Sequence, residues 1–319
     1  SSPKRPHPAP PALPVQSGQA PPHPGAMAPP QPSPRCASWL AALLAGLAPA
    51  TVRGFAMHAN HSQALWSGLR GRACSGGHCV VPAGESWLLD ESMHVETLTI
   101  EGTLRWDTSK DDLEIRAEYV VVTGQGRFEL GTRAQPMEKR ATIYLEKGGH
   151  SHHKFGQRFL GGLGSAVIEI HGRTLARTWT LLSRTAAAGT QELHLKHDPA
   201  AMGWRAGDRI GIATTSRGHS AVHRIESLGA SSVRLWEPLA DEHWGGFREV
   251  QGHRLEMAAE VVNLERTVLI TGDNDDFFST KQGLHTIMTG QGYFDVRYAR
   301  VEYCGQRDHL GRYCMHFHM

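Results

Sequence analysis

The sequence predicts an all-β protein whose short strands stack in a solenoid or a sandwich. Three observations support this prediction. Apolar and polar residues alternate in short segments along most of the chain, which is the pattern of half-buried strands. The 319 residues include 35 glycines, and only five of the 18 prolines follow residue 34, a composition that suits tight turns between strands. The sequence shows no long helical periodicity.

From Trp87 onward the predicted strands recur at intervals of about 20 residues, which suits a solenoid or sandwich better than a βαβ sheet. The alternating apolar pairs are Leu98 and Ile100, Leu104 and Trp106, Val120 and Val122, Ile168 and Ile170, Leu193 and Leu195, Ile210 and Ile212, and Val268 and Ile270. Gly102 lies between the first two pairs, where we expect it to permit a close approach of backbone. Helical turns are expected only at 258–264 and around Ala200.

The N-terminal residues are expected to lie outside the folded body. Residues 1–26 are proline-rich and hold too few apolar side chains to fold, so they are predicted to be disordered. Residues 27–50 contain a basic residue, an apolar run and a small-residue triplet, the pattern of a secretory signal peptide if translation begins at Met27. A short buried helix or a mis-joined gene model is the alternative. Residues 51–65 are then expected to form a linker, and the chain is expected to be secreted or to lie at the extracellular face of the plasma membrane.

Secretion would place the cysteines in an oxidising compartment. Cys36 would leave with the signal peptide, and the simplest pairing of the remaining four joins Cys74 to Cys79 and Cys304 to Cys314, although three connectivities are open. A zinc site is the rival interpretation, but the spacings C-x4-C and C-x9-C differ from the usual C-x2-C knuckle. In a secreted chain Asn60, in the sequon Asn60-His61-Ser62, is a candidate glycosylation site.

Charge and motifs exclude two classes of partner. The formal net charge is only +2, and no basic run is interleaved with aromatic residues, so a nucleic-acid groove is not expected. The sequence has neither a G-x-x-x-x-G-K-[ST] loop nor a correctly spaced G-x-G-x-x-G, so a nucleotide-binding fold is not expected either.

Six segments in the body of the chain resemble the G8 domain and the sequence that follows it in large extracellular proteins. Those that resemble the domain itself are VPAGESWLLD (81–90), LTIEGTLRWD (98–107) and VIEIHGRTLARTWTLLSRT (167–185). Those that resemble the following sequence are WRAGDRIGIATTSRGHS (204–220), AEVVNLERTVLITGD (259–273) and VEYCGQRDHLGRYCMHFHM (301–319). The last is similar to G-R-Y-P-[IV]-H-F-H-[LM], the signature that opens the right-handed parallel β-helix in the superfamily of fibrocystin-L and the cell-surface hyaluronidases.

The resemblance implies a G8 domain over residues 66–185 and the start of a right-handed parallel β-helix over 186–319, in what is expected to be a piece of a longer protein. Trp179 and Trp204 lie only 25 residues apart, which leaves no room for the large module that separates these positions in the hyaluronidases. The arrangement is therefore more similar to the receptor-like fibrocystin-L branch. Cys314 stands where the family usually has proline, and a bridge to Cys304 is expected to replace the rigidity of proline.

Two histidines in the last segment are candidate metal ligands. His316 and His318 are two residues apart, so in a strand both side chains point to one face, where two imidazoles can hold a divalent metal. A third ligand would come from His285, Asp308 or His309. The alternative is a row of hydrogen-bonded polar rings without a metal.

Asp273, Asp275 and Asp276 place three carboxylates at one turn, and calcium prefers such oxygen ligands. The resemblance adds that hyaluronan-degrading relatives depend on calcium, so calcium is the one cofactor considered. A polar turn is the alternative, because the run is shorter than an EF-hand loop. The histidines of the loop 148–154 suggest adventitious metal binding, a change of charge at about pH 6, contact with an anionic glycan, or simply a solvated loop.

The sequence shows no catalytic constellation. Glycoside cleavage needs two carboxyl groups about 5 to 10 Å apart, and Asp295, Glu302 and Asp308 near the signature are the first candidates for mutation. We therefore expect carbohydrate binding or adhesion in an extracellular coat, with a polysaccharide or glycoprotein as partner and a membrane anchor conceivable beyond residue 319. The alternatives are a calcium-dependent, hyaluronidase-like enzyme that degrades polysaccharide, and a structural wall component without a specific ligand.

Overall fold

A computed structural model describes residues 63–215 and 220–318. It is all-β, as predicted: within these ranges the regular elements are strands apart from two short helices, α1 (Trp66–Leu69) and α2 (Asn274–Thr280). The disordered stretch predicted at 1–26, the signal peptide predicted at 27–50, the candidate acceptor Asn60 and most of the linker at 51–65 lie outside the described residues. None of the described helices is long and apolar enough to cross a bilayer.

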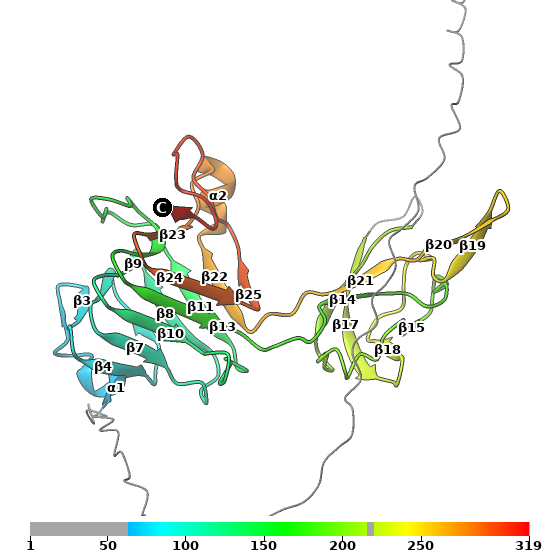
Figure 1. Ribbon diagram of the computed structural model, residues 1–319, viewed down its shortest axis with the longest axis horizontal. Coiled ribbons are helices and arrows are strands. Elements are labelled where there is room, and N and C mark those ends of the chain that lie inside the picture. The colour runs from blue at the N-terminus through cyan, green and yellow to red at the C-terminus, as the bar shows by residue number, and fades with distance from the viewer. Residues whose placement is uncertain (1–62, 216–219, 319) are drawn as a thin grey trace, which may run out of the picture. The chain divides into compact units, whose positions relative to one another are not determined.

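Three mainly parallel sheets form the main body (Figure 1). Sheet A has the order β1-β4-β7-β10-β13-β24, and all its neighbouring strands are parallel. Its strands are β1 (Ala64–Leu65), β4 (Ser86–Leu89), β7 (Thr103–Trp106), β10 (Arg127–Leu130), β13 (Val167–His171) and β24 (Tyr293–Arg297).

Sheets B and C complete the body. Sheet B has the order β2-β3-β6-β9-β12-β23-β26 and is parallel except for the β2–β3 hairpin. Its strands are β2 (Cys74–Ser75), β3 (His78–Val81), β6 (Thr97–Ile100), β9 (Tyr119–Val122), β12 (Phe159–Gly162), β23 (His285–Thr289) and β26 (Phe317–His318). Sheet C has the order β25-β22-β11-β8-β5 and is parallel throughout. Its strands are β5 (Met93–His94), β8 (Leu113–Ala117), β11 (Ala141–Leu145), β22 (Val268–Gly272) and β25 (Ala299–Val301).

The chain visits sheets B, A and C in turn, so that three consecutive strands make one coil. The coil β6-β7-β8 is followed by β9-β10-β11, and equivalent residues stack in register from one coil to the next. Leu98 pairs with Val120 in sheet B, and Ile115 pairs with Ile143 in sheet C. This stacking of coils is a parallel β-helix, as the resemblance implied.

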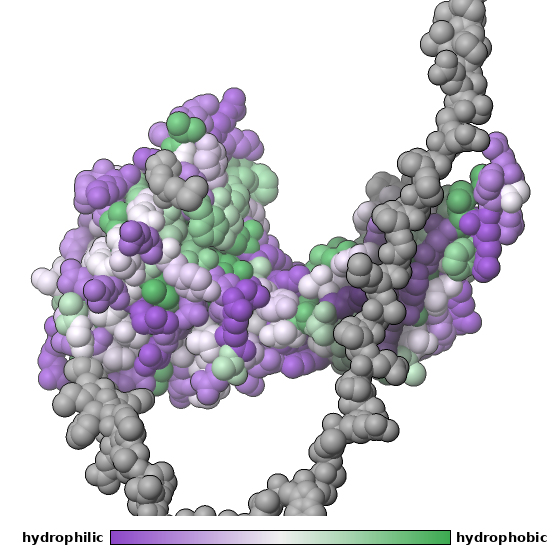
Figure 2. Space-filling view, viewed as in Figure 1, coloured by the Kyte–Doolittle hydropathy of each residue, from purple (hydrophilic) through white to green (hydrophobic). Residues whose placement is uncertain are grey.

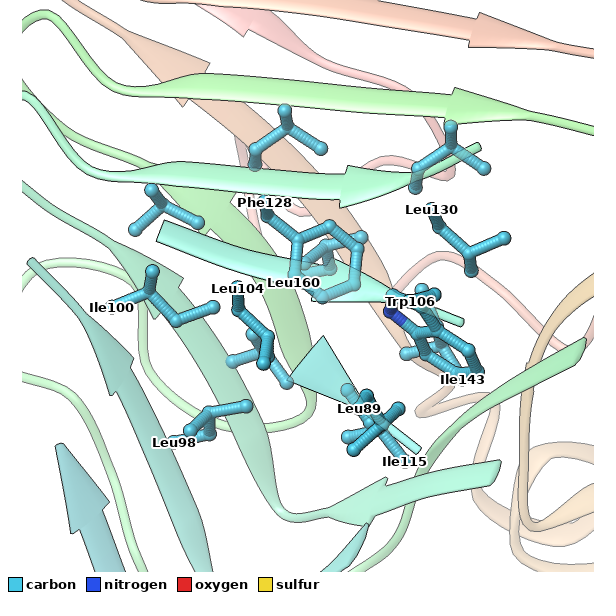
Figure 3. Close-up of a cluster of buried hydrophobic side chains, with 14 of the residues drawn as sticks. Leu89, Leu98, Ile100, Leu104, Trp106, Ile115, Phe128, Leu130, Ile143 and Leu160 are labelled. Carbon is cyan, nitrogen blue, oxygen red and sulfur yellow. The ribbon is translucent and has the colours of Figure 1, made fainter. Parts of the chain in front are cut away.

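Inward-pointing side chains from the three sheets fill the coils (Figure 3). The alternating pairs that the sequence predicts in this body are buried, each residue at most 3% exposed. Each buried aliphatic or aromatic side chain contributes about 1.5 to 3 kcal/mol, and a coil finds these contacts only against its neighbours. Gly102 has the predicted role, because a Cβ there would collide with the backbone carbonyl oxygens of Pro82 and Glu85.

We call the stacked parallel coils the ladder. Residues 174–265 leave the ladder between β13 and β22. They form an antiparallel sheet with the order β14-β21-β16-β17-β18-β15, together with the hairpin β19–β20. Its strands are β14 (Trp179–Leu181), β15 (Glu192–His194), β16 (Arg209–Ile212), β17 (Ala221–Leu228), β18 (Ser232–Leu235), β19 (Phe247–Val250), β20 (His253–Glu256) and β21 (Glu260–Asn263). A separate hydrophobic core fills this insertion and includes Trp204 and the predicted pairs from β15 and β16.

The insertion divides the chain differently from the predicted ranges. The parallel coils already begin inside 66–185, and residues 186–265, expected to start the β-helix, form the antiparallel sheet instead. The alternation of apolar and polar residues has a period of 2 in parallel and antiparallel sheets alike, so it does not distinguish between them. The strand direction depends on the connections, and short hairpin connections make neighbouring strands antiparallel. The helical turn predicted at 258–264 is wrong: this segment contains strand β21, in which buried Val261 alternates with exposed Glu260 and Val262.

Both predicted disulfides are present. Cys74 and Cys79 face each other in the β2–β3 hairpin. Cys304 and Cys314 close the loop between β25 and β26. The prediction that cysteines near each other in the sequence pair was confirmed because both pairs have short separations.

Candidate functional site

A row of rings lies on the outer face of sheet B. Leu98, Val120 and Leu160 point into the core, so the preceding residue in each strand points outward. Two of these outward residues, Tyr119 and Phe159, stack with ring centres 5.1 Å apart. Phe159 pairs in register with His285 of β23, and their rings lie 5.6 Å apart. The stacking of coils has therefore brought a histidine to the end of an aromatic row.

A first loop, residues 146–158 between β11 and β12, covers this row. The loop makes a tight turn in which His152 and Gly156 exchange two backbone hydrogen bonds of 2.8 Å. Phe155, at the tip of the turn, is buried and packs edge-on against Phe159 at 5.2 Å. The rings of His152 and Phe155 stack at 5.3 Å, so the loop is held down by aromatic contacts.

A second loop, residues 302–316 between β25 and β26, approaches from the other side. The Cys304–Cys314 disulfide closes it, and the Thr286 hydroxyl donates a 2.8 Å hydrogen bond to the carbonyl oxygen of Cys314. Arg312 lies directly against Gly156 of the first loop, where a Cβ would overlap the guanidinium group. Both loops rise beside β23 in Figure 1, the first in green and the second in red.

The two loops and strand β23 enclose a groove of about 530 Å³, which we call the β23 groove. Its main lining residues are Phe155, His285, Ile287, Arg312, Tyr313 and His316. Apart from this groove, Figure 2 shows apolar residues gathered beside α2, on an otherwise mostly polar face. A larger depression of about 730 Å³ lies over the turns that include Gly84, Gly102 and Gly124, but its lining includes no ring and no histidine.

His285 is the chemically distinctive residue of the β23 groove. The residue is 0% exposed, and its ring interacts with the backbone of Phe155, although neither ring nitrogen makes a hydrogen bond of normal geometry among the described residues. Burial, followed by the nearby positive charge of Arg312, lowers the pKa of His285 to about 3. A neutral imidazole offers one donor and one acceptor. The His285 ring can therefore exchange hydrogen bonds with a hydroxyl group of a ligand in the groove.

The predicted metal ligands lie at or near this groove. The His316 Nδ1 atom lies 2.6 Å from the carbonyl oxygen of Gly311, and its ring contacts Tyr313 at 5.1 Å. His318 pairs through its backbone with Thr289, and its side chain lies outside the described part of the chain. Of the expected third ligands, His285 lines the groove, whereas Asp308 is exposed in the second loop. Among described residues, no group of three metal-binding side chains includes His316. A metal at His316 and His318 stays a prediction.

The predicted calcium ligands anchor the start of α2. Asp273 accepts a 2.6 Å hydrogen bond from the Tyr144 hydroxyl. Asp276 accepts hydrogen bonds of 2.8 Å from Lys147 and from the buried Arg158. The hydrogen bond from Lys147 is the main cause of the lowered pKa of Asp276, and burial opposes it. Asp275 is exposed. Cationic side chains therefore occupy oxygens of Asp276, and a calcium site here stays a prediction.

The three acidic residues proposed for mutation stand apart from the β23 groove. Asp295 in β24 is bonded by Arg133, Arg297 and Tyr293. Burial opposes its ionisation, but these hydrogen bonds prevail and lower the pKa of Asp295 to about 2. Glu302 lies 3.0 Å from Arg300, and Asp308 lies 3.7 Å from Arg307. None of the three lines the groove.

Sequence reasoning missed Phe155 and Tyr313 and named His285 only as a third metal ligand. They are distant in sequence and meet only because β12, β23 and β26 are neighbours in sheet B. The one usable signal was Phe155, an aromatic residue inside a glycine- and histidine-rich loop.

Comparison with known proteins gives the family. Residues 66–183 match the family model of the G8 domain. The chain contains a G8 domain over these residues. The matched range runs from α1 to β14, so the G8 domain consists here of the first coils of the ladder and the entry into the insertion. Family membership and two disulfides indicate an extracellular protein.

The G8-domain protein is 29% identical to fibrocystin-L of Mus musculus, in a match that covers 76% of this chain and 7% of fibrocystin-L. It is 26% identical to a G8 domain-containing protein of Dictyostelium discoideum, covering 81% of this chain and 23% of that protein. The chain thus spans less than a quarter of the length of these relatives. Among solved structures, a tailspike of Acinetobacter baumannii bacteriophage AP22 in complex with capsular saccharide has a TM-score of 0.22 and 12% identity, covering 62% of this chain and 27% of that one. Our assignment of the fold rests on strand pairing.

Proposed function

We propose that the G8-domain protein binds carbohydrate outside the cell, holding a polysaccharide segment in the β23 groove without cleaving it. One observation carries this proposal: the buried, neutral imidazole of His285 lines the same groove as the rings of Phe155 and Tyr313, and neither of its ring nitrogens makes a hydrogen bond of normal geometry among the described residues. A saccharide ring has apolar C–H faces that pack on aromatic rings and hydroxyl groups that pair with a neutral imidazole. Few ligands match both features in one shallow site.

The charges of the groove favour an acidic polysaccharide. Lys154 and Arg312 are among its lining residues, and the lining includes no carboxylate. Tyr313 is 48% exposed, which leaves part of its ring open to a ligand. A chain bearing carboxylates or sulfates would thus meet two cationic side chains at the edges and aromatic rings within.

The same lining argues for binding and against hydrolysis. Glycoside hydrolysis in its common form uses two carboxyl groups on either side of the scissile bond. Asp295, the most strongly perturbed acid of the described residues, has a pKa of about 2 and is held by two arginines, so it is a poor proton donor. Its oxygens are engaged in structural contacts on sheet A.

The proposal is tested by incubating the purified protein with size-defined hyaluronan and with a neutral glucan, with and without calcium. We expect hyaluronan to be retarded in affinity electrophoresis and to keep its length in gel filtration. Tyr313→Ala should weaken retention by about tenfold or more, as expected for a truncated aromatic contact. Trp236→Ala is the control, because Trp236 is 59% exposed in the antiparallel insertion.

The other outcomes discriminate between the rival functions. If hyaluronan becomes shorter, the protein is a polysaccharide-degrading enzyme and not only a binding protein. If that reaction needs calcium, the result supports the calcium-dependent alternative. Retention of neither polysaccharide, or equal loss in Tyr313→Ala and Trp236→Ala, would overturn the proposal and favour a wall component without a specific ligand.

A further inference from the structure

A second cluster of titratable groups lies on sheet B, beside the first strands of the ladder. It consists of His78 at the start of β3, Glu96 immediately before β6, and His150 in the loop 146–158. One ligand atom from each side chain lies within 4.8 Å of the others. The His78 and His150 side chains are 48% and 39% exposed, so a solvated ion has access to them.

The distances suit a small metal ion. The Glu96 Oε2 atom lies 3.8 Å from the Nε2 atom of His78 and 3.7 Å from the Nε2 atom of His150. Around a tetrahedral zinc ion, with bonds of about 2.0 to 2.2 Å, neighbouring ligand atoms stand about 3.4 Å apart. A contraction of a few tenths of an ångström would bring each Nε2 atom to ligand distance from Glu96, and the two histidines, whose ligand atoms lie within 4.8 Å of each other, would close by up to about 1.4 Å.

The outer partners of the two rings are the stronger evidence. The Nδ1 atom of His78 lies 2.8 Å from the Thr97 hydroxyl, in hydrogen-bond geometry, and the Nδ1 atom of His150 lies 3.0 Å from a carboxylate oxygen of Glu118, at ion-pair distance but without hydrogen-bond geometry. Metal-bound histidines typically donate their second N–H to such an oxygen, which fixes the tautomer and turns the other nitrogen to the metal. Both Nε2 atoms face Glu96 in this way.

The backbone around the cluster is shaped to admit these carboxylates. A Cβ at Gly77 would come within 2.7 Å of the side chain of Glu96, and a Cβ at Gly148 would overlap the carboxylate of Glu118. The backbone N–H of His150 donates a 2.6 Å hydrogen bond to Glu118 as well. The Cys74–Cys79 disulfide closes the hairpin that carries His78. Each ligand thus has a local structural support.

We propose that His78, Glu96 and His150 form a binding site for one divalent transition-metal ion with the preferences of zinc. Two imidazoles and one carboxylate are a ligand set that zinc accepts, and three protein ligands leave a fourth position for water. Because His150 comes from the loop 146–158 and the other two ligands come from the ladder, the ion would fasten this loop to sheet B. The site is separate from the β23 groove and does not depend on the proposed carbohydrate function.

The test is direct metal binding by the purified chain. After removal of metals with a chelator and dialysis, zinc is titrated by calorimetry, and bound zinc is counted by elemental analysis after gel filtration. We expect one zinc ion per chain. His150→Ala and Glu96→Gln should each weaken binding by at least about a hundredfold, because a lost first ligand costs more than the ten- to hundredfold typical of an outer partner.

Two matched variants control for histidine content. His153 is exposed in the same loop, and His94 is exposed on sheet C, so His153→Ala and His94→Ala should bind zinc as the wild type does. Far-UV circular dichroism in chelator should be the same for all variants, which separates loss of metal from loss of fold. If His150→Ala is misfolded, His150→Gln takes its place.

Three results would overturn the proposal. The first is wild-type protein that holds no stoichiometric zinc. The second is an equal loss of zinc in His150→Ala and His153→Ala. The third is loss of zinc in a His316→Ala, His318→Ala double variant together with retention of zinc in His150→Ala. This result would show that zinc binds at the site predicted in the last segment.

Discussion

At the residue scale, His285 makes folding sensitive to acid. A histidine of the unfolded chain titrates near the ordinary value of 6.5, and the folded chain keeps His285 neutral down to about pH 3. Between these values the unfolded state binds a proton that the folded state does not. Stability is therefore complete above pH 6.5 and falls as the pH drops toward 3, by up to about 1.4 kcal/mol for each pH unit.

We expect His285→Phe to remove this part of the acid sensitivity. Urea unfolding at pH 7.0, 5.5 and 4.0 gives the free energy of unfolding at each pH. The slope of this free energy against pH is then compared between the variant and the wild type. Because Phe fills a similar volume among Phe155 and Phe159, the variant should also be at least as stable as wild type at pH 5.5. Equal slopes in the two proteins would show that His285 is not the group responsible.

Asp295 is expected to affect the stability of the protein at a lower pH than His285 does. Its carboxyl group has a folded pKa of about 2 against an ordinary value of 3.8, and its side chain is 11% exposed. The stabilisation is present above pH 3.8 and is lost as the pH falls to about 2, with a total of about 2 kcal/mol. Asp295→Asn should destabilise the protein at pH 6 and flatten the acid-unfolding curve below pH 4, which circular dichroism can follow. A curve as steep as that of the wild type would contradict this assignment.

At the element scale, the turn between β6 and β7 depends on a residue without a side chain. Gly102→Ala should destabilise the chain by about 1 to 3 kcal/mol, because the new methyl group meets two carbonyl oxygens of the preceding coil. Gly149→Ala is the matched control, since a Cβ there has no heavy atom within 4 Å. Urea denaturation compares the two, and similar midpoints would mean that the turn can move aside.

The strands themselves could be predicted because their evidence is local. Pairs such as Val120 and Val122 alternate within four residues, and burial of every second side chain follows from strand geometry. Whether a strand pairs parallel or antiparallel is not local. This is why residues 186–265 were assigned to the parallel ladder and why strand β21 was taken for a helical turn.

The candidate sites depended still more on distant pairing. His78, Glu96 and His150 are separated by 18 and 54 residues, and no spacing motif joins them. They meet because β3 pairs with β6 in the register that sets His78 beside Thr97, and because a loop two coils later folds back. By contrast, both disulfides join cysteines no more than ten residues apart, so sequence proximity was sufficient to predict them.

At the scale of the whole molecule, the antiparallel sheet is an insertion with its two ends side by side. The backbone N–H of Arg173, before the insertion, donates a 2.8 Å hydrogen bond to the hydroxyl of Thr267, after it. The insertion and the coils also have separate hydrophobic cores. Both observations indicate that the ladder does not need the insertion in order to fold.

We therefore expect a chain in which residues 174–265 are replaced by a short Gly-Ser linker to keep its parallel coils. Arg173→Ser is included, because Arg173 otherwise loses its buried partner Asp208, to which it donates hydrogen bonds of 2.7 and 2.8 Å. A far-UV circular dichroism spectrum typical of β-sheet and one cooperative thermal transition would show that the ladder folds without the insertion. An aggregated or unfolded product would refute this. In the intact chain, Arg173→Ser alone should cost about 3 to 5 kcal/mol, because Asp208 then keeps a buried charge without its cation.

The loop 146–158 contacts both candidate sites at once, since His150 faces Glu96 while Phe155 forms a wall of the β23 groove. Two ligands that each favour the docked loop must strengthen each other's binding by the same factor, whichever of them arrives first. A metal ion would then raise the affinity for saccharide, and saccharide would raise the affinity for the metal by the same factor. In an extracellular setting such a loop would make adhesion respond to the local supply of zinc.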